Sequence, residues 1–531
     1  MKRILGLPGN NRRSWLFTVV FVALLLATVR MGARNPFLPG QDFHYHTMSA
    51  AIAAQGWTTQ AFPSSLYHRV APLDANTLFY LLVAPFELVT SPLRAISLGI
   101  TLYYFVGFPL ACLGALRLLR RSPWGALLAF PCSYIKSFLG FGYMPFVSAG
   151  PLYVLGLAVM HRVLARDSNE RAERRTLALA MVIFAATFLA HAHVYGWLMF
   201  IAAIMTVVTI GRRLLPELPR APELAVREAL GTGIRALLVV LPSMILAITW
   251  SLRVRGGDST PFVPEKSTYK AKLEAILPHI LAQTRGEEEY AYLGGFFLVI
   301  LLALLLARRI KDFPSPEIAL GLTLASFLIL PWHVNLQSLA PRQIDIALWT
   351  LPLVVYPASA VAGVRARHAV VVTAFAVFAA LRLNQIDTKL QAFQKEMAGL
   401  LALAKDCPPG PAEIAYVTSE MESENMTGLG LHQAHETFAA LCRLDTPVYD
   451  TTKPAYRVSP LRYKGALPAP ITILVRHSNW YAGGAIWRNF EYVLLYKWRA
   501  TGTMIEEASR DADRIGISGD WELWRRKPSG G

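Results

Sequence analysis

The residues of this sequence that could do chemistry are a small set of carboxyl, imidazole and cationic side chains next to apolar segments. An ionisable side chain at a membrane boundary is costly unless it is paired or useful, so each one is a candidate for function. The topology derived below places eight of them at the same face of the membrane: Asp42, His44, His46, Lys136, His191, His193, His333 and Arg342.

Asp42 is the candidate for acid–base catalysis. A carboxylate at the membrane face can accept the proton of an attacking hydroxyl or amine. The structural alternative is an N-cap for a helix over His44–Ala54, a role that aspartate often takes. The sequence alone favours the cap slightly and leaves the catalytic role open.

A divalent metal is a second possibility at this face, with Asp42, His44 and His46 as its candidate ligands. Imidazole and carboxylate groups suit transition metals. However, residues two apart share one face only in an extended strand, not in a helix. The chain has no His-Glu-x-x-His and no Cys-x-x-Cys. Interfacial histidines that bind a phosphate or lie among lipid headgroups are the favoured reading, and metal dependence stays open.

The composition indicates a membrane protein. Of the 531 residues, 54% are hydrophobic and only 16% are charged, and the apolar residues occur in blocks long enough to cross a hydrocarbon core of about 30 Å. The formal net charge is +17, yet the part from Ile386 onward carries about 17 basic and 17 acidic residues. The excess therefore lies in short loops between apolar blocks, which is the positive-inside pattern and argues against nucleic-acid binding.

One topology accounts for the basic loops. Five arginines lie in His161–Arg175 and five more in Gly211–Arg235, and both loops fall on the cytoplasmic side if the N-terminus does. This requires the run Thr77–Val89 to lie along the interface rather than to span. About eleven spans follow: 15–31, 94–117, 122–139, 144–163, 176–191, 194–210, 235–252, 291–307, 316–331, 345–363 and 368–386.

The sequence divides into two predicted domains. Residues 1–386 form the transmembrane domain, with extracytoplasmic loops at 32–93 and 253–290, the second containing a surface helix. Residues 387–531 form a small extracytoplasmic α/β domain, since apolar strands alternate with helical patterns. The strands are expected at Glu413–Ser419, Ile471–Arg476, Phe490–Tyr496 and Trp521–Trp524, and the helices at Gly428–Leu441 and Ile505–Ile515.

The cysteines and two further histidines carry weaker signals. Cys112 and Cys132 lie in apolar segments, which indicates packing residues, whereas Cys407 and Cys442 could form a disulfide in an oxidising compartment. The pair His432 and His435 has helical i, i+3 spacing but no third ligand, which favours surface residues over a metal site. The sequence contains no Walker loop, no GxGxxG and no Gly-x-Ser-x-Gly elbow.

The layout resembles that of the GT-C superfamily of polyprenyl-phosphate-sugar-dependent glycosyltransferases, which includes the protein O-mannosyltransferase-like and aminoarabinose transferase-like enzymes. An acidic residue follows the first helix, and the segment LFYLLVAPF at 78–86 is similar to the juxtamembrane PPLYYLLLAPF helix of that superfamily. HAHVYG at 191–196 stands where these enzymes often carry a TK-G stretch, and Arg342 resembles the arginine at the start of a late helix. The strands FEYVLLYKW and GDWELWRRK resemble those of bacterial C-terminal domains.

The resemblance implies a multi-pass transferase of the cell inner membrane. Its donor would be a polyprenyl-phosphate-linked sugar and its acceptor a glycan, lipid or protein. Asp42 would be the catalytic base, while His191, His193 and Arg342 would hold the donor phosphate. The supporting residues would be His44, His46, His333 and Lys136.

The sequence also departs from the family pattern in two places. Residues 140–150 contain no second acidic residue, which leaves metal-dependent chemistry in doubt, and histidine replaces the TK lysine. A membrane transporter or flippase predicts charges near mid-membrane and pseudo-symmetric broken helices. A scaffold that has lost its chemistry would explain the missing carboxylate. The sugar, the acceptor and the oligomeric state are not determined by the sequence.

Overall fold

A run of long apolar helices builds most of the chain. The computed structural model describes residues 11–40, 42–53, 67–69, 74–135, 139, 142–165, 170–255, 264–265, 267–276, 281–306, 315–334, 337–355, 366–408, 412–420, 422–427, 431, 433–444, 461–463, 484–497 and 502–528. Among these residues, seven helical segments are long and apolar enough to cross a membrane: Trp15–Arg34, Pro92–Leu118, Met144–Ala165, Ala192–Glu217, Pro222–Arg253, Glu287–Leu305 and Ala369–Glu396.

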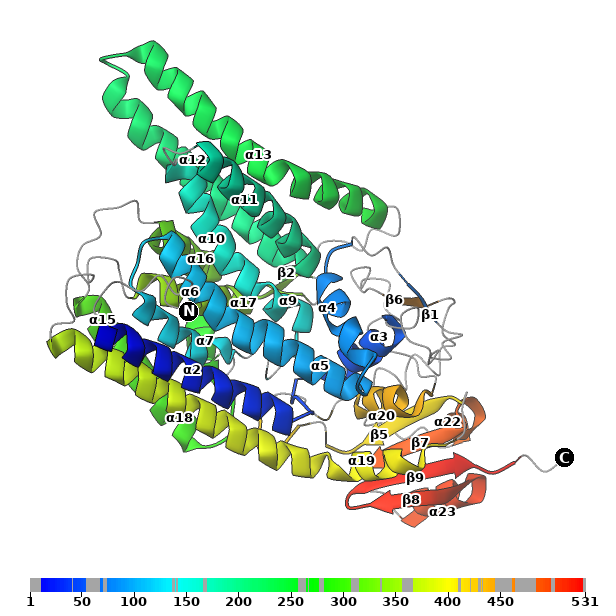
Figure 1. Ribbon diagram of the computed structural model, residues 1–531. Helices are drawn as coiled ribbons and strands as arrows, with labels where there is room; N and C mark the ends of the chain where they lie inside the picture. Colours follow the sequence, from blue (N-terminus) through cyan, green and yellow to red (C-terminus); the bar gives the residue numbers. More distant parts are fainter. Residues whose placement is uncertain are drawn as a thin grey trace.

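These segments correspond to labelled elements in Figure 1. The elements are α2 (Asn11–Arg34), α5 (Pro92–Ile100) with the π-helix η2 (Thr101–Val106) and α6 (Gly107–Leu118), α9 (Met144–Ser148) with α10 (Gly150–Ala165), α12 (Ala192–Glu217), α13 (Pro222–Arg255), α15 (Glu287–Leu306) and α18 (Ala366–Glu396). The multi-pass α-helical membrane fold predicted from the sequence is confirmed.

The other four predicted spans also have helical counterparts. One is α11 (Glu170–Ala190), with 21 residues, and two are the shorter helices α16 (Ser315–Ile329) and α17 (Ala340–Val354), with 15 residues each. The predicted span 122–139 is not one helix: it is the 3-10 helix η3 (Pro123–Leu128) followed by α7 (Ala129–Ser133). Proline lacks a backbone N–H, so Pro123 and Pro131 favour a break here.

Two short helices lie between α2 and α5, as the sequence indicated. These are α3 (Phe43–Ala53) and α4 (Leu78–Glu87). With 10 residues, α4 is about 15 Å long, half of what a span requires. Its Phe79, Tyr80 and Val83 are buried, and it packs against α3 and α5. This length and packing agree with leaving 77–89 out of the span count.

The C-terminal part contains a four-stranded sheet in the order β5-β7-β9-β8. Strands β5 and β7 are parallel, while β9 is antiparallel to both of its neighbours. The strands are β5 (Ile414–Thr418), β7 (Tyr492–Tyr496), β8 (Ala512–Ser518) and β9 (Trp521–Arg526), and the helices are α19 (Ala398–Leu403), α20 (Ala434–Cys442), α22 (Gly484–Asn489) and α23 (Gly502–Asp511), with the 3-10 turn η6 (Ala404–Asp406).

Three of the predicted strands are confirmed, and one predicted helix is partly wrong. The expected helix at 505–515 ends at Asp511, because β8 begins at Ala512 and pairs with β9. Tertiary pairing has overridden the helical pattern there. The expected strand 471–476 and His432 lie outside the described residues. His435 is buried and stacks on Tyr416, so it is not the surface residue expected. The expected domain start, Asp387, falls inside α18.

Two small sheets connect loops that are far apart in the sequence. Strand β1 (Tyr67–Arg69) pairs with β6 (Leu461–Tyr463), which joins the first predicted extracytoplasmic loop to the C-terminal part. The second sheet has the order β2-β3-β4, from β2 (Pro264–Glu265), β3 (His333–Val334) and β4 (Gln337–Ser338). It joins the second predicted loop to the hairpin that leads into α17.

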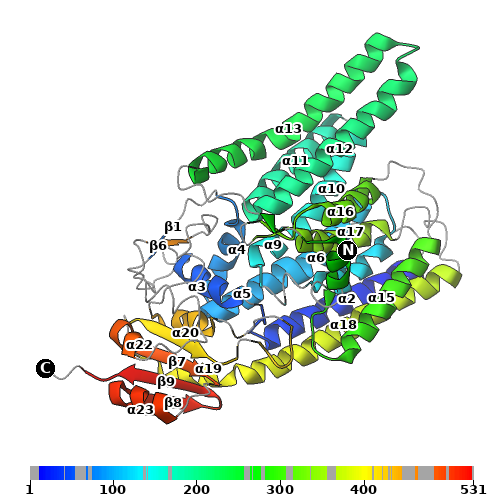
Figure 2. The same cartoon turned by 180° about the vertical axis from the view of Figure 1, so that it is seen from behind.

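The C-terminal sheet lies on the same side of the molecule as α3, the helix that Asp42 precedes (Figures 1 and 2). Helix α20 packs on α3, and His44 Nδ1 lies 2.7 Å from the Thr437 hydroxyl. The segment before α15 also contacts this part of the chain, because Arg285 N donates to the Asn425 carbonyl at 3.2 Å. Both predicted extracytoplasmic loops and the C-terminal sheet therefore lie on one side of the molecule.

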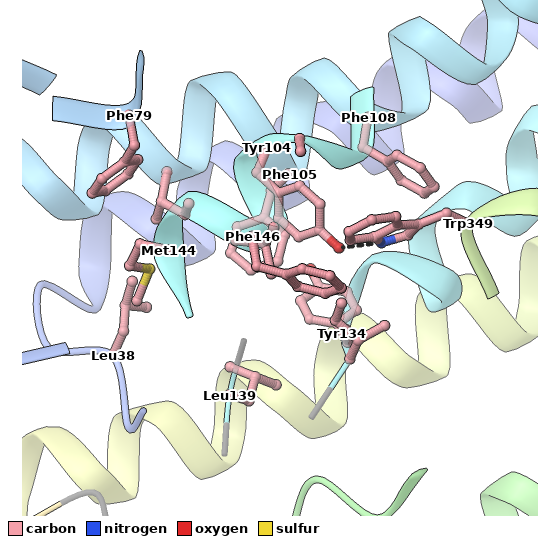
Figure 3. Close-up of a cluster of buried hydrophobic side chains, with 14 of the residues drawn as sticks. Leu38, Phe79, Tyr104, Phe105, Phe108, Tyr134, Leu139, Met144, Phe146 and Trp349 are labelled. Atoms are coloured by element: carbon pink, nitrogen blue, oxygen red, sulfur yellow. Dashed lines mark hydrogen bonds between the residues drawn. The ribbon is translucent and has the colours of Figure 1, made fainter. Parts of the chain in front are cut away.

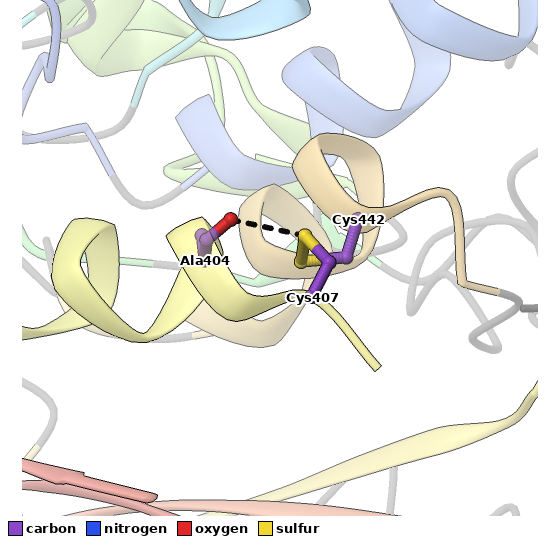
Figure 4. Close-up of a disulfide and its surroundings, with 3 residues drawn as sticks. All are labelled: Ala404, Cys407 and Cys442. Carbon is purple, nitrogen blue, oxygen red and sulfur yellow. Dashed lines mark hydrogen bonds between the residues drawn. A yellow bond between two sulfur atoms is a disulfide. The ribbon is translucent and has the colours of Figure 1, made fainter. Parts of the chain in front are cut away.

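A disulfide joins Cys407 to Cys442, with their Cα atoms 5.2 Å apart (Figure 4). It links the residue after η6 to the last turn of α20, the helix that packs on α3. The Cys407 sulfur lies 3.0 Å from the carbonyl oxygen of Ala404. Cys112 and Cys132 are buried and free, as expected for packing residues.

Replacing Cys442 by serine is expected to lower the free energy of unfolding of the C-terminal part by about 2–4 kcal/mol, because the crosslink closes a loop of 35 residues. The measurement is thermal unfolding of the purified full chain with and without a reductant. Reduction of the wild type should reproduce the variant, and Cys112→Ser, at a free cysteine, is the control for the reductant. Equal melting of oxidised and reduced wild type would contradict the assignment.

Candidate functional site

Arg342 stands at the centre of the candidate site, in the first turn of α17. Its side chain is 6% exposed, and its guanidinium lies 4.7 Å from the ring centre of Tyr143 and 5.4 Å from that of Phe146. It hydrogen-bonds to Tyr143 and interacts electrostatically with Asp42 and Asp345. A buried arginine needs such partners, because an uncompensated charge would be strongly destabilising.

Asp42 precedes α3 directly, and its carbonyl oxygen accepts the first helical hydrogen bond from His46 N at 2.9 Å. The backbone of Asp42 packs closely against Gly142, whose φ is +70°. A Cβ atom at position 142 would lie 3.0 Å from Asp42 N and 2.8 Å from Phe43 N. Only glycine readily adopts this positive φ and leaves room for so close a contact. Gly142 therefore sets the backbone position from which the Asp42 side chain extends.

His191 and His193 lie where α11 ends and α12 begins. His191 has an extended backbone between the two helices, and its ring meets Phe146 edge-on at 5.3 Å. His193 Nε2 lies 3.2 Å from the side-chain nitrogen Nε2 of Gln343, the residue after Arg342. The charge of Arg342 acts on both imidazoles. The fold thus brings Asp42, both histidines and Arg342 to one place.

An aromatic cluster supports this end of α17 (Figure 3). The Trp349 indole N–H donates to the Tyr104 hydroxyl at 3.0 Å, and that hydroxyl donates to the Ser133 carbonyl at 2.8 Å. The Phe146 ring contacts both the Trp349 ring, at 4.9 Å, and the Arg342 guanidinium, at 5.4 Å. The cluster connects α17 to η2 and α7, so the direction of the Arg342 side chain is set by packing.

Four other residues expected at the site are placed differently or not described. His44 hydrogen-bonds to Thr437, as noted, and His46 Nδ1 lies 2.6 Å from the Tyr80 hydroxyl. Successive α-helical residues are about 100° apart, so two histidines at i and i+2 point to opposite sides of α3. His333 lies in β3, and of its side chain nothing is described. Lys136 lies outside the described residues.

The candidate metal ligands Asp42, His44 and His46 are not assembled into a site in the part of the chain that the structure describes. No group of three or more histidine, cysteine or acidic side chains there is placed to hold an ion. The reason is local: α3 directs His44 toward Thr437 of α20 and His46 toward Tyr80 of α4. The residues present at Arg342 instead suit an anionic group such as a phosphate.

Three residues that line the site were missed in reading the sequence. Asp345 is 1% exposed and shares a helix face with Arg342, because they are three positions apart. Gln343 and Tyr143 contact His193 and Arg342, respectively. The sequence did contain a signal for Asp345, because an aspartate in an apolar run follows an arginine by one helical turn. The predicted span began at residue 345 and left out Arg342, so the two residues were not recognised as neighbours on one helix.

Together the fold and this site define a polytopic membrane protein with acidic, imidazole and guanidinium groups gathered at one boundary. Its fold resembles that of GT-C membrane glycosyltransferases of known structure. ArnT from Cupriavidus metallidurans in the apo state is similar over 96% of this chain and 98% of that one, with a TM-score of 0.55 and 12% sequence identity. ArnT of the same organism bound to undecaprenyl phosphate gives a TM-score of 0.54 at 12% identity, over 96% and 97% of the two chains.

An oligosaccharyltransferase of Archaeoglobus fulgidus, in a complex with Zn and sulfate, is a more distant likeness. Its TM-score is 0.40 at 13% identity, over 92% of this chain and 69% of that one. No protein-family model matches this sequence, and no curated protein matches it. The similarity to ArnT, over nearly the full length of both chains, therefore concerns the fold.

Proposed function

We propose that the chain is an inner-membrane glycosyltransferase that moves a sugar from a polyprenyl-phosphate donor to an acceptor at the periplasmic face. The observation that carries this proposal is the buried Arg342, which interacts electrostatically with Asp42 and Asp345 and with the imidazoles of His191 and His193. ArnT, which shares the fold, has been captured with undecaprenyl phosphate. The N-terminus would be cytoplasmic and the C-terminal part periplasmic.

The proposed reaction is a displacement at the anomeric carbon. The acceptor hydroxyl or amine attacks that carbon and gives its proton to Asp42, while the bond between the anomeric carbon and the phosphate oxygen breaks. The electron pair of that bond leaves with the polyprenyl phosphate. Arg342 would stabilise the added negative charge, since a positioned cation acts most strongly in a site with little water. His191 and His193 would donate hydrogen bonds to the same phosphate.

The roles of the remaining parts follow from their positions. Asp345 would keep the guanidinium of Arg342 oriented when the site is empty. The C-terminal sheet, docked through α20 on α3, would cover the site or select the acceptor. A scaffold without chemistry is the alternative that the absence of an acidic residue in 140–150 favours, and it predicts that no donor lipid is bound.

Arg342→Gln is expected to reduce binding of the donor lipid and to lower transfer about 10²-fold, because removal of one positioned donor to developing charge has a cost of this size. The experiment is mass spectrometry of lipids that co-purify with the detergent-solubilised wild type and the variant. A polyprenyl phosphate, or its sugar ester, should be enriched in the wild type only, and its mass would name the donor.

The matched control is Arg174→Gln, which removes an exposed arginine paired with Glu170 on the surface. It should retain the lipid. If neither the wild type nor the control carries a polyprenyl lipid, the transferase proposal loses its support in favour of the scaffold or transporter. If Arg342→Gln retains the lipid fully, the role assigned to Arg342 is wrong.

A further inference from the structure

Gln343 is a side chain of the candidate site that the proposed reaction does not use. It lies on α17 and is fully buried, with 0% of its surface exposed. Its Nε2 lies 3.2 Å from Nε2 of His193. Its Oε1 is buried and has no hydrogen-bond partner in the part of the chain that the structure describes. A buried amide oxygen without a partner is costly, so packing alone does not explain a glutamine at this position.

The packing of α12 sets the contact between Gln343 and His193. His193 and Trp197 are four residues apart on α12 and therefore share one face of that helix. The Trp197 indole N–H donates to the Thr323 hydroxyl of α16 at 3.0 Å, and α16 packs along α17. This face of α12 is thus directed at the pair of α16 and α17, and the His193 ring meets Gln343 there.

The direction of the amide decides where His193 carries its proton. An amide NH₂ group only donates, so the ring nitrogen that it faces must accept. A neutral imidazole has one donor nitrogen and one acceptor nitrogen, whereas an imidazolium ion has no acceptor. With Nε2 as the acceptor, His193 is neutral and its proton lies on Nδ1.

The Nδ1–H group of His193 is then available to a ligand. The residue is half-buried, and its Nδ1 makes no hydrogen bond with the described residues. The charge of Arg342 acts on the same ring. An N–H donor next to a guanidinium suits a phosphate oxygen. The opposite amide direction would place the proton on Nε2 and leave a lone pair at Nδ1, which a phosphate would repel.

We propose that Gln343 is a positioning residue, which holds His193 as the Nδ1–H tautomer so that this ring can donate to the phosphate of the lipid donor. Gln343 acts through the imidazole and does not touch the phosphate, because its own side chain is fully buried. A partner on one ring nitrogen sets the proton on the other nitrogen in the same way at metal sites. The phosphate part of this inference rests on the proposed transferase function, whereas the tautomer of His193 does not.

The first test is nitrogen NMR spectroscopy of the full-length protein in detergent, labelled at histidine. The His193 signals are assigned by their loss in His193→Ala. The wild type should carry the His193 proton on Nδ1. Gln343→Met, which keeps the approximate shape of the side chain but has no amide, should show a mixture of the two tautomers. A proton on Nε2 in the wild type, or the same tautomer in Gln343→Met as in the wild type, overturns the proposal.

The second test is native mass spectrometry of the same protein titrated with undecaprenyl phosphate. Gln343→Met should weaken binding about tenfold, the effect of one hydrogen bond to a charged group. In a His193→Ala background the same substitution should add no further loss, because Gln343 acts through that ring. The matched control is Gln391→Met, at an exposed glutamine of α18 that donates to Asp387, and it should bind the lipid as the wild type does.

Thermal unfolding separates this role from a structural one. Gln343→Met should melt no lower than the wild type, since it removes a buried oxygen that lacks a partner. A lower melting temperature together with a binding loss that persists in His193→Ala means that Gln343 only supports packing, and it overturns the proposal. Should Gln343→Met fail to fold, Gln343→Asn, whose amide is one methylene short of the ring, replaces it with the same expected loss of binding.

Failure of the proposed function gives a different result. A wild type with the His193 proton on Nδ1 that does not bind undecaprenyl phosphate contradicts the lipid-phosphate donor, and the phosphate role of His193 is overturned with it. The pairing of Gln343 with His193 is supported in that case. A wild type that binds the lipid but carries the proton on Nε2 contradicts only the role of Gln343.

Discussion

Replacing Asp42 by asparagine is expected to lower sugar transfer about 10³-fold while leaving donor binding nearly unchanged, because general-base catalysis contributes about 10²–10⁴-fold. Asparagine has the same shape but cannot accept a proton from the acceptor. The backbone of residue 42 is fixed by Gly142 and by α3, so the side chain should stay in place. The measurement is the single-turnover rate with the donor lipid identified by co-purification.

Asp387→Asn is the matched control for this prediction. Asp387 lies on the same side of the molecule and accepts hydrogen bonds from Asn35 at 2.9 Å and Gln391 at 3.0 Å. The substitution makes the same change of charge at a half-buried position away from Arg342, and transfer should stay within about twofold of the wild type. A rate for Asp42→Asn close to that of Asp387→Asn would rule out Asp42 as the base and leave it the N-terminal residue of α3.

Replacing Glu289 by glutamine is expected to lower the free energy of unfolding by about 3–5 kcal/mol, because it leaves a buried arginine without its counter-charge. Arg382 Nη1 and Nη2 donate to the two carboxylate oxygens of Glu289 at 2.7 and 2.9 Å, and the two side chains are 2% and 0% exposed. Thr284 and Gln283 N add hydrogen bonds of 2.7 and 2.8 Å. This pair joins α15 to α18.

Unfolding of the purified protein in mixed detergent micelles measures the effect. Glu170→Gln is the control, since its pair with Arg174 is 79% and 78% exposed and an exposed pair contributes at most about 1 kcal/mol. The double variant Glu289→Met/Arg382→Met should recover most of the loss, because it removes both charges together. A loss below about 1 kcal/mol in Glu289→Gln would mean that the pair is hydrated in the folded protein.

The Glu289–Arg382 pair also affects the face that carries the candidate site. Residues 282–285, just before α15, hydrogen-bond to residues 425–427 of the C-terminal part, for example from Thr427 N to the Gln283 carbonyl at 3.1 Å. Lys389 of α18 contacts Glu288 at 3.1 Å. We therefore expect Glu289→Gln to loosen the docking of the C-terminal sheet as well as the helix pair.

The sequence by itself predicted the multi-pass helical membrane fold and the positions of most long helices. Apolar length and the distribution of arginines are local properties, and they decide whether a segment enters a bilayer before any tertiary contact forms. The same holds for α4, whose short apolar run marked it as different from a span, and for β5, β7 and β9, whose apolar runs have the length of strands.

Tertiary structure alone decided which polar groups meet. Asp42 and Arg342 lie near opposite ends of the transmembrane part of the sequence, and only the packing of α3, α9 and α17 brings them together. Asp345, Gln343 and Tyr143 joined the site for the same reason. The Glu289–Arg382 pair and the Cys407–Cys442 disulfide likewise depend on which helices become neighbours, which a one-dimensional pattern does not encode.

The two histidines of α3 show most clearly the difference between what the sequence determines and what the tertiary structure determines. Their i, i+2 spacing was read correctly as unsuitable for one face of a helix, and α3 is a helix. What their side chains contact was set by α20 on one side and α4 on the other. Local sequence fixes the direction of a side chain relative to its own helix. The neighbour that it meets depends on contacts between segments far apart in the chain.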